Sequence, residues 1–344
     1  MHLIAGDIGG TKTLLALART QGSATEIIAQ QRFDSAAHHG IEPMLRELLD
    51  RAQATHSVIN AACFAIAGPV EGDMPDQHAR LTNLPWRLDS TAIATALDGA
   101  RVRLLNDLAG IAHAIDVLPD DQRVVLQAGH LSAHGQRLVA APGTGFNSAL
   151  ICPGAGPLRI LPAESGHAAF SPANSRQLEL MRHVSTREGR CTREHLLAGP
   201  ALPRLLDFVA TEAGHPPADA LQTAMHAGDP SAAIGQAALA GTDPLAVATL
   251  QLYAELLAGQ IADLALAALP AGGVYLAGGV PAKVLPFLQA PGFTTALHDR
   301  PPMSHLLEAL HIEVVLDEQV GLRGALEAAR QLASEPEPHE SSTP

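Results

Sequence analysis

The sequence predicts an α/β protein in which mixed β-sheets are flanked by helices. Residues 2–33 read as three short strands joined by tight turns, after which helices and strands alternate to about residue 115. A similar order of elements begins again after residue 107. The chain has 344 residues, which is enough for two domains with a core each. The renewed order indicates two related halves.

The first half begins with strands and continues with alternating helix and strand. Apolar residues over 2–8 predict a strand that enters a Gly-Gly turn, and 13–18 and 25–33 predict the next two strands. Apolar residues recur at helical spacing over 41–54, which predicts an amphipathic helix. A buried strand over 61–67 then ends at Gly68-Pro69.

The second half contains five further strands and most of the helix. We expect strands over 124–127, 137–141, 148–151, 272–279 and 312–316, mainly helix over 175–270, and a closing helix over 320–333. The tail 334–344 is polar and rich in proline, so we expect it to be disordered.

Composition excludes several classes of protein. The formal net charge of −13 and the aromatic content of 3% argue against a nucleic-acid partner. No run of 18 apolar residues and no signal peptide are found, so we expect a cytoplasmic protein without a membrane span. Cys63, Cys152 and Cys191 have no metal-ligand spacing and are expected to be reduced thiols, two of them in apolar cores.

The stretch Asp7–Thr13 joins two expected strands and is rich in glycine and threonine. Its N–H groups and hydroxyls suit a phosphate, and its acid suits a hydrated metal ion. It departs from the P-loop because Thr11 replaces the second glycine and a strand follows. A plain β-hairpin turn is the alternative. The candidate nucleotide-binding residues here are Asp7, Gly9, Gly10, Thr11, Lys12 and Thr13.

Two further glycine turns adjoin strands. Pro142 precedes Gly143, Thr144 and Gly145, which form a second candidate phosphate turn, with a simple hairpin as the alternative. Gly278-Gly279 follows a strand, and Gly279 could leave room for a base or a ribose. The alternative there is a glycine pair required for packing.

Asn106-Asp107 ends a short apolar strand where a helix of small residues begins. A carboxylate at such a strand end projects into the crevice where α/β proteins bind ligands. The alternative is that Asp107 only caps the helix. Glu164 and His167 form a second polar pair, and Pro162 and Pro172 frame them as a loop. Their side chains suit vicinal hydroxyls, although a surface turn is the alternative.

The three glycine turns, in this order and spacing, resemble the two-domain sugar kinase and actin-like ATPase superfamily, and within it the bacterial ATP-dependent glucokinases. The resemblance covers about residues 3–332. It implies an actin-like ATPase (ribonuclease H-like) fold with the active site in the interdomain cleft. The small domain would comprise 1–110 and 319–333, and the large domain 111–318.

The resemblance also implies a function, namely ATP-dependent phosphorylation of the glucose 6-hydroxyl in glycolysis. Asp107 would be the catalytic base. ATP would lie on the glycine turns with Mg²⁺ held through water at Asp7, and the protein would be a homodimer. The implied glucose-binding residues are Asn83, Asn106, Asp107, Glu164, His167 and Glu194.

The chain departs from the family pattern at several positions near these turns. Ala141 and Ser165 stand where glycine is usual, and Phe146-Asn147 stands where Leu-Gly is frequent. These changes bear on nucleotide affinity and on turnover. Two alternatives therefore stay open: a kinase for another hexose, and a catalytically weak sugar-binding or sensing protein.

Overall fold

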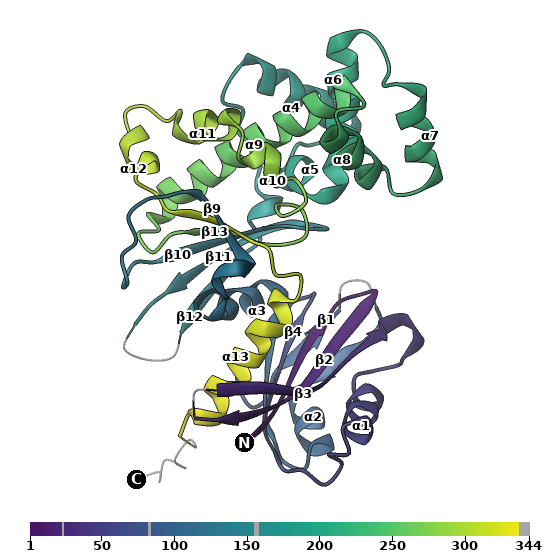
Figure 1. The fold of residues 1–344 in the computed structure, drawn as a ribbon, viewed down its shortest axis with the longest axis vertical. Coiled ribbons are helices and arrows are strands. Elements are labelled where there is room, and N and C mark those ends of the chain that lie inside the picture. Colours follow the sequence, from purple (N-terminus) through teal and green to yellow (C-terminus); the bar gives the residue numbers. More distant parts are fainter. Residues whose placement is uncertain (23, 82–83, 155–157, 337–344) are drawn as a thin grey trace. The chain divides into compact units, whose positions relative to one another are not determined.

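The computed structural model describes residues 1–22, 24–81, 84–154 and 158–336. Two compact units make up the chain (Figure 1). Unit 1 contains Met1–Leu118 and the chain from Gln319 onward, and unit 2 contains Pro119–Glu318.

Unit 1 is built on a five-stranded sheet, and its first three strands form the expected meander. The strand order is β3-β2-β1-β4-β8. The strands are β1 (His2–Ile8), β2 (Lys12–Gln21), β3 (Ala24–Asp34), β4 (Ile59–Ile66) and β8 (Arg101–Asn106). All five strand predictions are confirmed, with the second extended at both ends.

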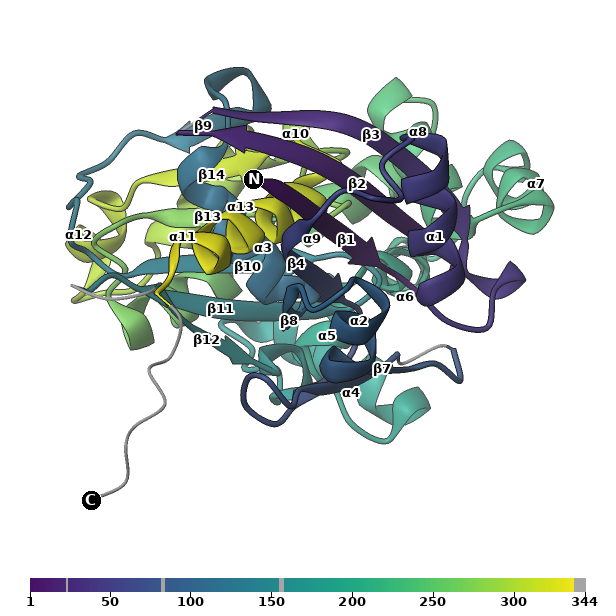
Figure 2. The same ribbon diagram turned by 90° about the horizontal axis from the view of Figure 1, so that it is seen from below.

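The parallel strands of this sheet end together, which gathers polar residues at one edge. Figure 2 shows β1, β4 and β8 side by side. β1 pairs in parallel with β4, and β4 with β8, in a register that aligns Ile8, Ile66 and Asn106. The residues that follow these three ends therefore lie at the same edge of the sheet, where ligands bind in open α/β sheets.

Helices cover both faces of the sheet in unit 1. Helices α1 (Glu42–Arg51) and α2 (Ser90–Ala96) pack on the face that carries the bulky apolar residues. The opposite face carries small residues and contacts α13 (Val320–Ser334). Its small side chains, with those of α13, are Ala5, Ala16, Ala61, Cys63, Ala65, Ala325, Ala328 and Ala329. Helix α3 (Asp107–Ala114) packs beside α13.

A second, three-stranded sheet in unit 1 was not expected from the sequence. It consists of β5 (Val70–Glu71), β6 (His78–Arg80) and β7 (Arg87–Asp89), all two or three residues long. Trp86 beside it is 4% exposed, and its indole N–H donates to the carbonyl of His38 at 3.1 Å. Trp86 is therefore a core anchor of unit 1.

Unit 2 repeats the sheet topology of unit 1. Its strand order is β12-β11-β10-β13-β14-β9. The first five strands match β3-β2-β1-β4-β8 in order and direction, because the first two pairs are antiparallel and the next two parallel. The strands are β9 (Arg123–Gln127), β10 (Arg137–Pro142), β11 (Phe146–Cys152), β12 (Arg159–Ala163), β13 (Val274–Leu276) and β14 (Ile312–Val315). The two halves are thus related.

The edge strand β12 corrects the sequence-based interpretation of its surroundings. Pro162 was expected to belong to a loop, but it pairs with Ala149 inside the ladder between β11 and β12. Proline fits there because an edge strand leaves one side of its backbone without a ladder partner. The polar turn consequently begins only after Ala163.

The helical stretch of unit 2 is divided into separate helices, as expected for 175–270. They are α4 (Ser175–Glu188), α5 (Arg193–Leu197), α6 (Leu202–Ala213), α7 (Asp219–Ala227), α8 (Pro230–Ala240) and α9 (Pro244–Ala268). Three short helices follow β13, namely α10 (Leu285–Leu288), α11 (Pro291–His298) and α12 (Ser304–Glu308).

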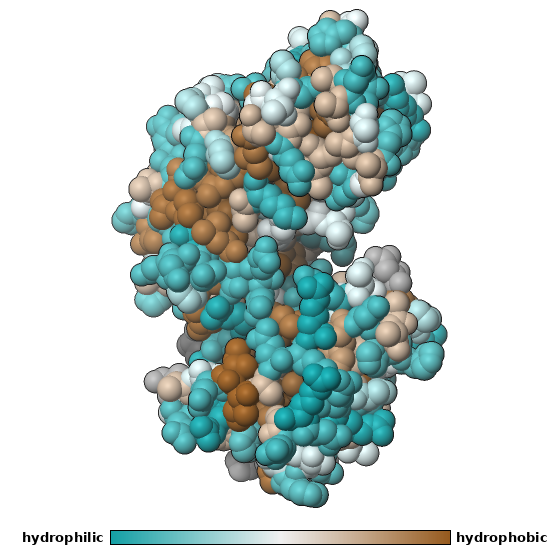
Figure 3. Space-filling model, turned by 45° about the vertical axis from the view of Figure 1, so that its right-hand side comes forward, coloured by the Kyte–Doolittle hydropathy of each residue, from teal (hydrophilic) through white to brown (hydrophobic). Residues whose placement is uncertain are grey.

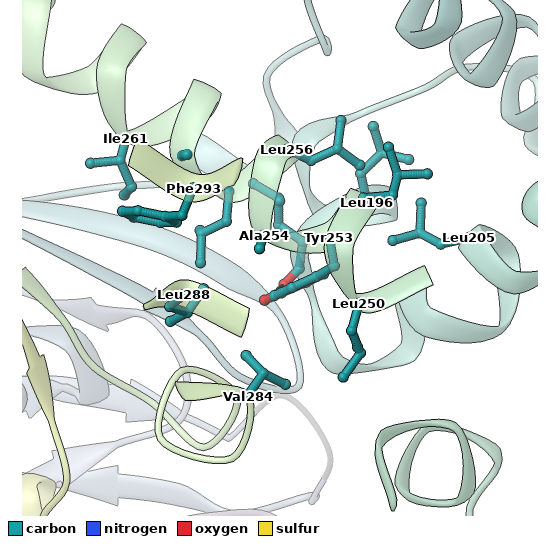
Figure 4. Packing of buried hydrophobic residues seen from close by; sticks show 14 of the residues in the cluster. Leu196, Leu205, Leu250, Tyr253, Ala254, Leu256, Ile261, Val284, Leu288 and Phe293 are labelled. Atoms are coloured by element: carbon teal, nitrogen blue, oxygen red, sulfur yellow. Dashed lines mark hydrogen bonds between the residues drawn. The ribbon is translucent and has the colours of Figure 1, made fainter. Parts of the chain in front are cut away.

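Helix α9 is the central core element of unit 2. Figure 4 shows Tyr253 and its helical neighbours among side chains from α5, α6, α10 and α11. The buried Tyr253 hydroxyl donates to the carbonyl of Leu197 at 2.9 Å. By length and composition α9 could cross a membrane, but 72% of its most apolar window is buried inside the protein. We therefore describe α9 as a core helix.

The surface in the view of Figure 3 is mostly polar and carries a few apolar patches. Exposed large apolar residues of the described chain include Ile27 and Ile28 on β3, at 47% and 42% exposure. Cys63 and Cys191 are buried thiols, as expected, and Cys152 is half-buried. Helix α13 continues to Ser334, the first residue of the expected tail, and residues 337–344 lie outside the described part.

Candidate functional site

The first glycine turn connects β1 to β2 in unit 1. The Gly9 N–H donates to the carbonyl of Lys12 at 2.9 Å, which closes a tight hairpin turn. A Cβ on Gly9 would lie 3.1 Å from that carbonyl oxygen. Thr11 and Lys12 are exposed beside it. The stretch is thus a hairpin turn, as the alternative interpretation held, and it also presents exposed polar groups.

Ser35, which sequence analysis missed, braces this turn from the end of β3. Its hydroxyl donates to the carbonyl of Gly9 at 2.8 Å and lies 3.0 Å from the Thr13 hydroxyl. Its N–H donates to the carbonyl of Thr11 at 3.1 Å. Both Ser35 and Thr13 have 0% exposure. The Thr13 hydroxyl therefore supports the turn from within the core.

Asp7 lies at the end of β1, next to the turn, and Gly321 of α13 packs against it. A Cβ on Gly321 would lie 2.8 Å from the Asp7 carboxylate, so glycine allows this close approach. Burial, with a smaller effect from the charge of Asp107, raises the pKa of Asp7 to about 6, whereas Lys12 acts in the opposite direction. The two carboxyl groups and the lysine thus form one electrostatic cluster.

Asp107 is the first residue of α3 and directly follows β8. It therefore lies at the edge where the parallel strands of unit 1 end. The helix cap is Asn106, whose Oδ1 accepts the N–H of Ala109 at 2.7 Å. The Asp107 carboxylate accepts the N–H of Leu108 at 2.8 Å. Asn106 therefore performs the capping that sequence analysis considered for Asp107. The positive end of the helix dipole favours an ionised carboxylate at this position.

The second and third glycine turns lie together in unit 2. The turn at Gly143–Gly145 connects β10 to β11, at the position equivalent to the first turn in unit 1. Gly278 has φ +87°, and a Cβ there would lie 2.6 Å from the carbonyl oxygen of Pro142. A Cβ on Gly143 or Gly279 would meet nothing within 4 Å. These two glycines therefore border open space.

Glu194 is fixed to the backbone of the second glycine turn. Its Oε2 accepts the N–H of Phe146 at 3.0 Å. A Cβ on Gly145 would lie 2.7 Å from the same oxygen. Thr192 caps α5 with a capping box, which places Glu194 in the first turn of that helix. The Glu194 carboxylate is thus held inside a polar cluster.

The turn that follows β12 contacts the same cluster. Glu164 precedes the 3₁₀ turn η4 (Ser165–His167). The Glu164 Oε2 accepts a hydrogen bond from the Asn147 Nδ2 at 2.8 Å. A Cβ on Gly166 would lie 1.9 Å from the carbonyl oxygen of Phe146 and 3.4 Å from the Glu194 Cβ. The tight packing of Gly166 therefore brings Glu164, His167 and Glu194 to the start of β11.

Exposed polar groups in this cluster suit a polyhydroxyl ligand. The Glu164 and His167 side chains are exposed, and Glu194 is half-buried. Carboxylates accept hydrogen bonds from hydroxyls, and a neutral imidazole both donates and accepts. Asn83, another candidate sugar ligand, lies outside the described residues.

The described residues fit a nucleotide with a hydrated metal ion better than a metal held by protein alone. Among them, no group of three or more His, Cys, Asp and Glu side chains could hold a metal. Mg²⁺ usually keeps several waters and binds one or two carboxylates together with phosphates. A cation near Asp7 would also stabilise its ionised form, which burial and, to a smaller extent, the charge of Asp107 disfavour.

Comparisons with known proteins agree with this arrangement. The family model for glucokinase matches residues 4–332. A glucokinase of Trichormus variabilis is 33% identical, over 96% of this chain and 99% of the relative. The crystal structure of a glucokinase from an Antarctic psychrotroph superposes with a TM-score of 0.83 at 25% identity, covering 96% of this chain and 99% of that one.

A second solved structure resembles this chain in fold. It is a glucokinase from Balamuthia mandrillaris in complex with glucose, with a TM-score of 0.77 at 22% identity, covering 96% of this chain and 93% of that one. The fold class is therefore the actin-like ATPase fold expected from the sequence. The family model and the relative of T. variabilis span nearly the whole sequence, and the chain belongs to the glucokinase family of hexose kinases.

Proposed function

We propose that this protein transfers the γ-phosphoryl group of ATP to the 6-hydroxyl of D-glucose, giving glucose 6-phosphate and ADP. The observation that carries the proposal is the clustering of Glu164, His167 and Glu194 around the turn at Gly143–Gly145. It joins a candidate sugar-binding cluster to a candidate phosphate turn. Membership of the glucokinase family and the glucose bound to the Balamuthia relative support the choice of substrate.

Each polar group in the proposal has a defined task. Glu164, His167 and Glu194 bind hydroxyls of the sugar, and the amide of Asn106 donates to a neighbouring hydroxyl while its Oδ1 caps α3. Asp107 accepts the proton of the attacking hydroxyl. Its carboxylate lies in the first turn of α3, at the positive end of the helix dipole.

The glycine turns would bind the nucleotide. The Gly10 N–H and the Thr11 hydroxyl, with Thr144 and Gly145 of the second turn, would offer donors for the phosphates, and Lys12 adds a positive charge. Gly9 and Gly143 would shape the two turns, because their N–H groups donate to the carbonyls of Lys12 and Gly145. The open space at Gly279 would admit the base or the ribose. Mg²⁺, held through water at Asp7, would supply charge neutralisation of the phosphates.

A hexose panel with purified protein and coupled detection of ADP tests the proposal. We expect glucose to have the highest kcat/KM, with turnover dependent on Mg²⁺. A higher kcat/KM for fructose, mannose or an amino sugar would assign the protein to that sugar instead. Sugar binding in calorimetry without ADP release would mean a sensing protein and would contradict the kinase proposal.

The cellular setting belongs to the same proposal. The resemblance to bacterial glucokinases supports a cytoplasmic homodimer that acts in glycolysis. Apolar side chains on the surface, such as Ile27 and Ile28, are compatible with a contact between subunits. Sedimentation at micromolar concentration should give the mass of a dimer, and a mass near 35.8 kDa would contradict it.

A further inference from the structure

The ladder between β11 and β12 places Asn147 directly opposite Glu164. The last pair in that ladder is Ser148 with Ala163. Continuing the antiparallel register by one residue pairs Asn147 with Glu164. Side chains opposite each other in an antiparallel pair lie on the same face, with their Cβ atoms about 4.5–5.5 Å apart. The backbone therefore brings the two side chains together.

Both polar atoms of the Asn147 amide contact the sugar-binding turn. Its Nδ2 donates to Glu164 Oε2 at 2.8 Å, and its Oδ1 accepts the N–H of Gly166 at 3.3 Å. Asn147 is half-buried on a strand, whereas Glu164 is exposed. An exposed glutamate has many rotamers, so a hydrogen bond from a fixed strand residue reduces this freedom.

These two hydrogen bonds require a polar side chain at position 147. In the family pattern that the sequence resembles, glycine is frequent at the position of Asn147, and glycine offers neither donor nor acceptor beyond its backbone. The departure that sequence analysis related to weaker turnover thus forms a bond to a proposed sugar ligand.

We propose that Asn147 is a positioning residue that holds the Glu164 carboxylate in the orientation in which it binds glucose. The inference rests on the proposed function, because it takes Glu164 as a ligand of the sugar. Pre-organising a binding group lowers the entropy lost on binding. Asn147 therefore raises the affinity for glucose without taking part in phosphoryl transfer.

Two substitutions separate the contacts of the Asn147 amide. Asn147→Ala removes both bonds. Asn147→Asp has almost the same shape and keeps an acceptor for the Gly166 N–H, but it replaces the donor to Glu164 with a carboxylate. Like charges placed directly opposite repel and raise the pKa of the pair. Asn147→Asp thus changes the interaction with Glu164 from attraction to repulsion, while the hydrogen bond from the Gly166 N–H is kept.

Steady-state kinetics over a range of pH provide the test. We expect Asn147→Ala to raise the KM for glucose about five- to tenfold, which is less than the full effect of a hydrogen bond to a charged group because this bond acts only through the orientation of the exposed Glu164. The kcat should stay within about twofold and the KM for ATP unchanged, since neither proposed set of contacts includes Asn147. Asn147→Asp should raise the glucose KM further at pH 8, and the ratio of its KM to that of Asn147→Ala should fall toward 1 as pH drops toward 5.5. Ionisable groups common to both variants, His167 and Glu194 included, cancel in that ratio.

Asn60 provides the matched control. It lies on β4 of unit 1, where its Oδ1 accepts the N–H of His2 at 2.9 Å. The same two substitutions there should leave the glucose KM and its pH dependence unchanged.

The outcomes separate this inference from the proposed function. The positioning role alone would be overturned if both Asn147 variants kept the wild-type KM for glucose and its pH dependence while Glu164→Gln abolished glucose binding. No glucose turnover by the unaltered protein would overturn the proposed function instead.

Discussion

Asp7 occupies a position whose requirements for stability and for ligand binding differ. Its carboxylate is largely removed from water beside Gly321 and lies within the field of Asp107, so ionisation destabilises the folded chain in the absence of a cation. The proposed binding of a hydrated Mg²⁺ at Asp7 requires this same ionised form. Functional sites commonly have this cost, and the fold tolerates it through the packing of unit 1.

The free energy of unfolding of the ligand-free protein should therefore depend on the ionisation of Asp7. The pKa of Asp7 is about 6 in the folded state, against 3.8 for an unperturbed aspartate side chain. Folded and unfolded chains are both protonated below about pH 4, so Asp7 has no cost there. The cost grows as pH rises to 6 and reaches on the order of 3 kcal/mol above it.

Asp7→Asn cannot ionise, so its melting temperature relative to the unaltered protein should rise between pH 4 and pH 7 and then level off. Thermal melts without nucleotide or Mg²⁺ measure this difference. Exposed Asp73 provides a control for the loss of one negative charge. A difference between Asp7→Asn and the unaltered protein that is constant with pH would show that Asp7 has no raised pKa.

The adjacent glycines 278 and 279 differ in what an added methyl group would contact. Gly279→Ala meets nothing within 4 Å, so the protein should fold normally. If the nucleotide lies there, the KM for ATP should rise about tenfold or more through steric exclusion. Enzyme kinetics with varied ATP measure the effect, and an unchanged KM would place the nucleotide elsewhere.

Gly278→Ala is the companion variant. Its φ of +87° and the 2.6 Å approach to the Pro142 carbonyl make the alanine strained as well as crowded. We expect a loss of about 1–3 kcal/mol in the free energy of unfolding, measured by urea denaturation. Equal stability of the two variants would contradict this account of the turn.

At the scale of elements, unit 1 depends on two glycines where α3 crosses α13. A Cβ on Gly324 would lie 1.7 Å from the carbonyl oxygen of Gly110, and a Cβ on Gly110 would lie 2.5 Å from the Ala65 Cβ. The neighbouring contacts of α13 are mostly alanines on the sheet. Small residues at all these positions allow the helices to lie close to the sheet edge that carries Asp7 and Asp107.

Gly324→Ala should therefore destabilise the protein despite the higher helix propensity of alanine. Backbone atoms must move, and we expect a loss of about 2–4 kcal/mol in urea denaturation. Gly235 on α8 is the matched control, since a Cβ there would meet nothing within 4 Å. Gly235→Ala should be neutral or stabilising by up to about 1 kcal/mol. A neutral Gly324→Ala would mean that the crossing is looser than described.

Sequence patterns predicted most strands of the two larger sheets and missed β12 and the small three-stranded sheet. The strands that build most of both sheets have apolar runs bounded by glycine, which is a strong local signal. The strands β5, β6 and β7 have only two or three residues, too few for a period to be recognised. Strand β12 was missed because Pro162 suggests a loop when the partner strand is unknown.

The same limit applies to the candidate site. Glycine turns and strand-end acids are local features, so the sequence indicated them. The roles of Ser35 and Asn147 depend on partners 26 and 17 residues away, at Gly9 and Glu164. Such contacts follow from strand register, which a single sequence does not specify. Asn147 was visible only as a departure from the family pattern.

At the scale of the whole molecule, one topology occurs twice. Each unit joins its first two antiparallel strands through a glycine turn, at Gly9–Lys12 in unit 1 and Gly143–Gly145 in unit 2. Unit 1 contributes the acids Asp7 and Asp107, and unit 2 contributes Glu164, His167 and Glu194. Each unit therefore carries its own glycine turn and its own set of candidate polar residues.

The most direct measurement is glucose binding and turnover by the Asp107→Asn variant. The amide keeps the shape and hydrogen-bonding capacity needed for the sugar but is not a base. Calorimetry should give a glucose Kd within about threefold of the unaltered protein, while coupled ADP release should give a kcat lower by about 10²–10⁴-fold. A kcat close to that of the unaltered protein would contradict the assignment of Asp107 as the group that accepts the proton.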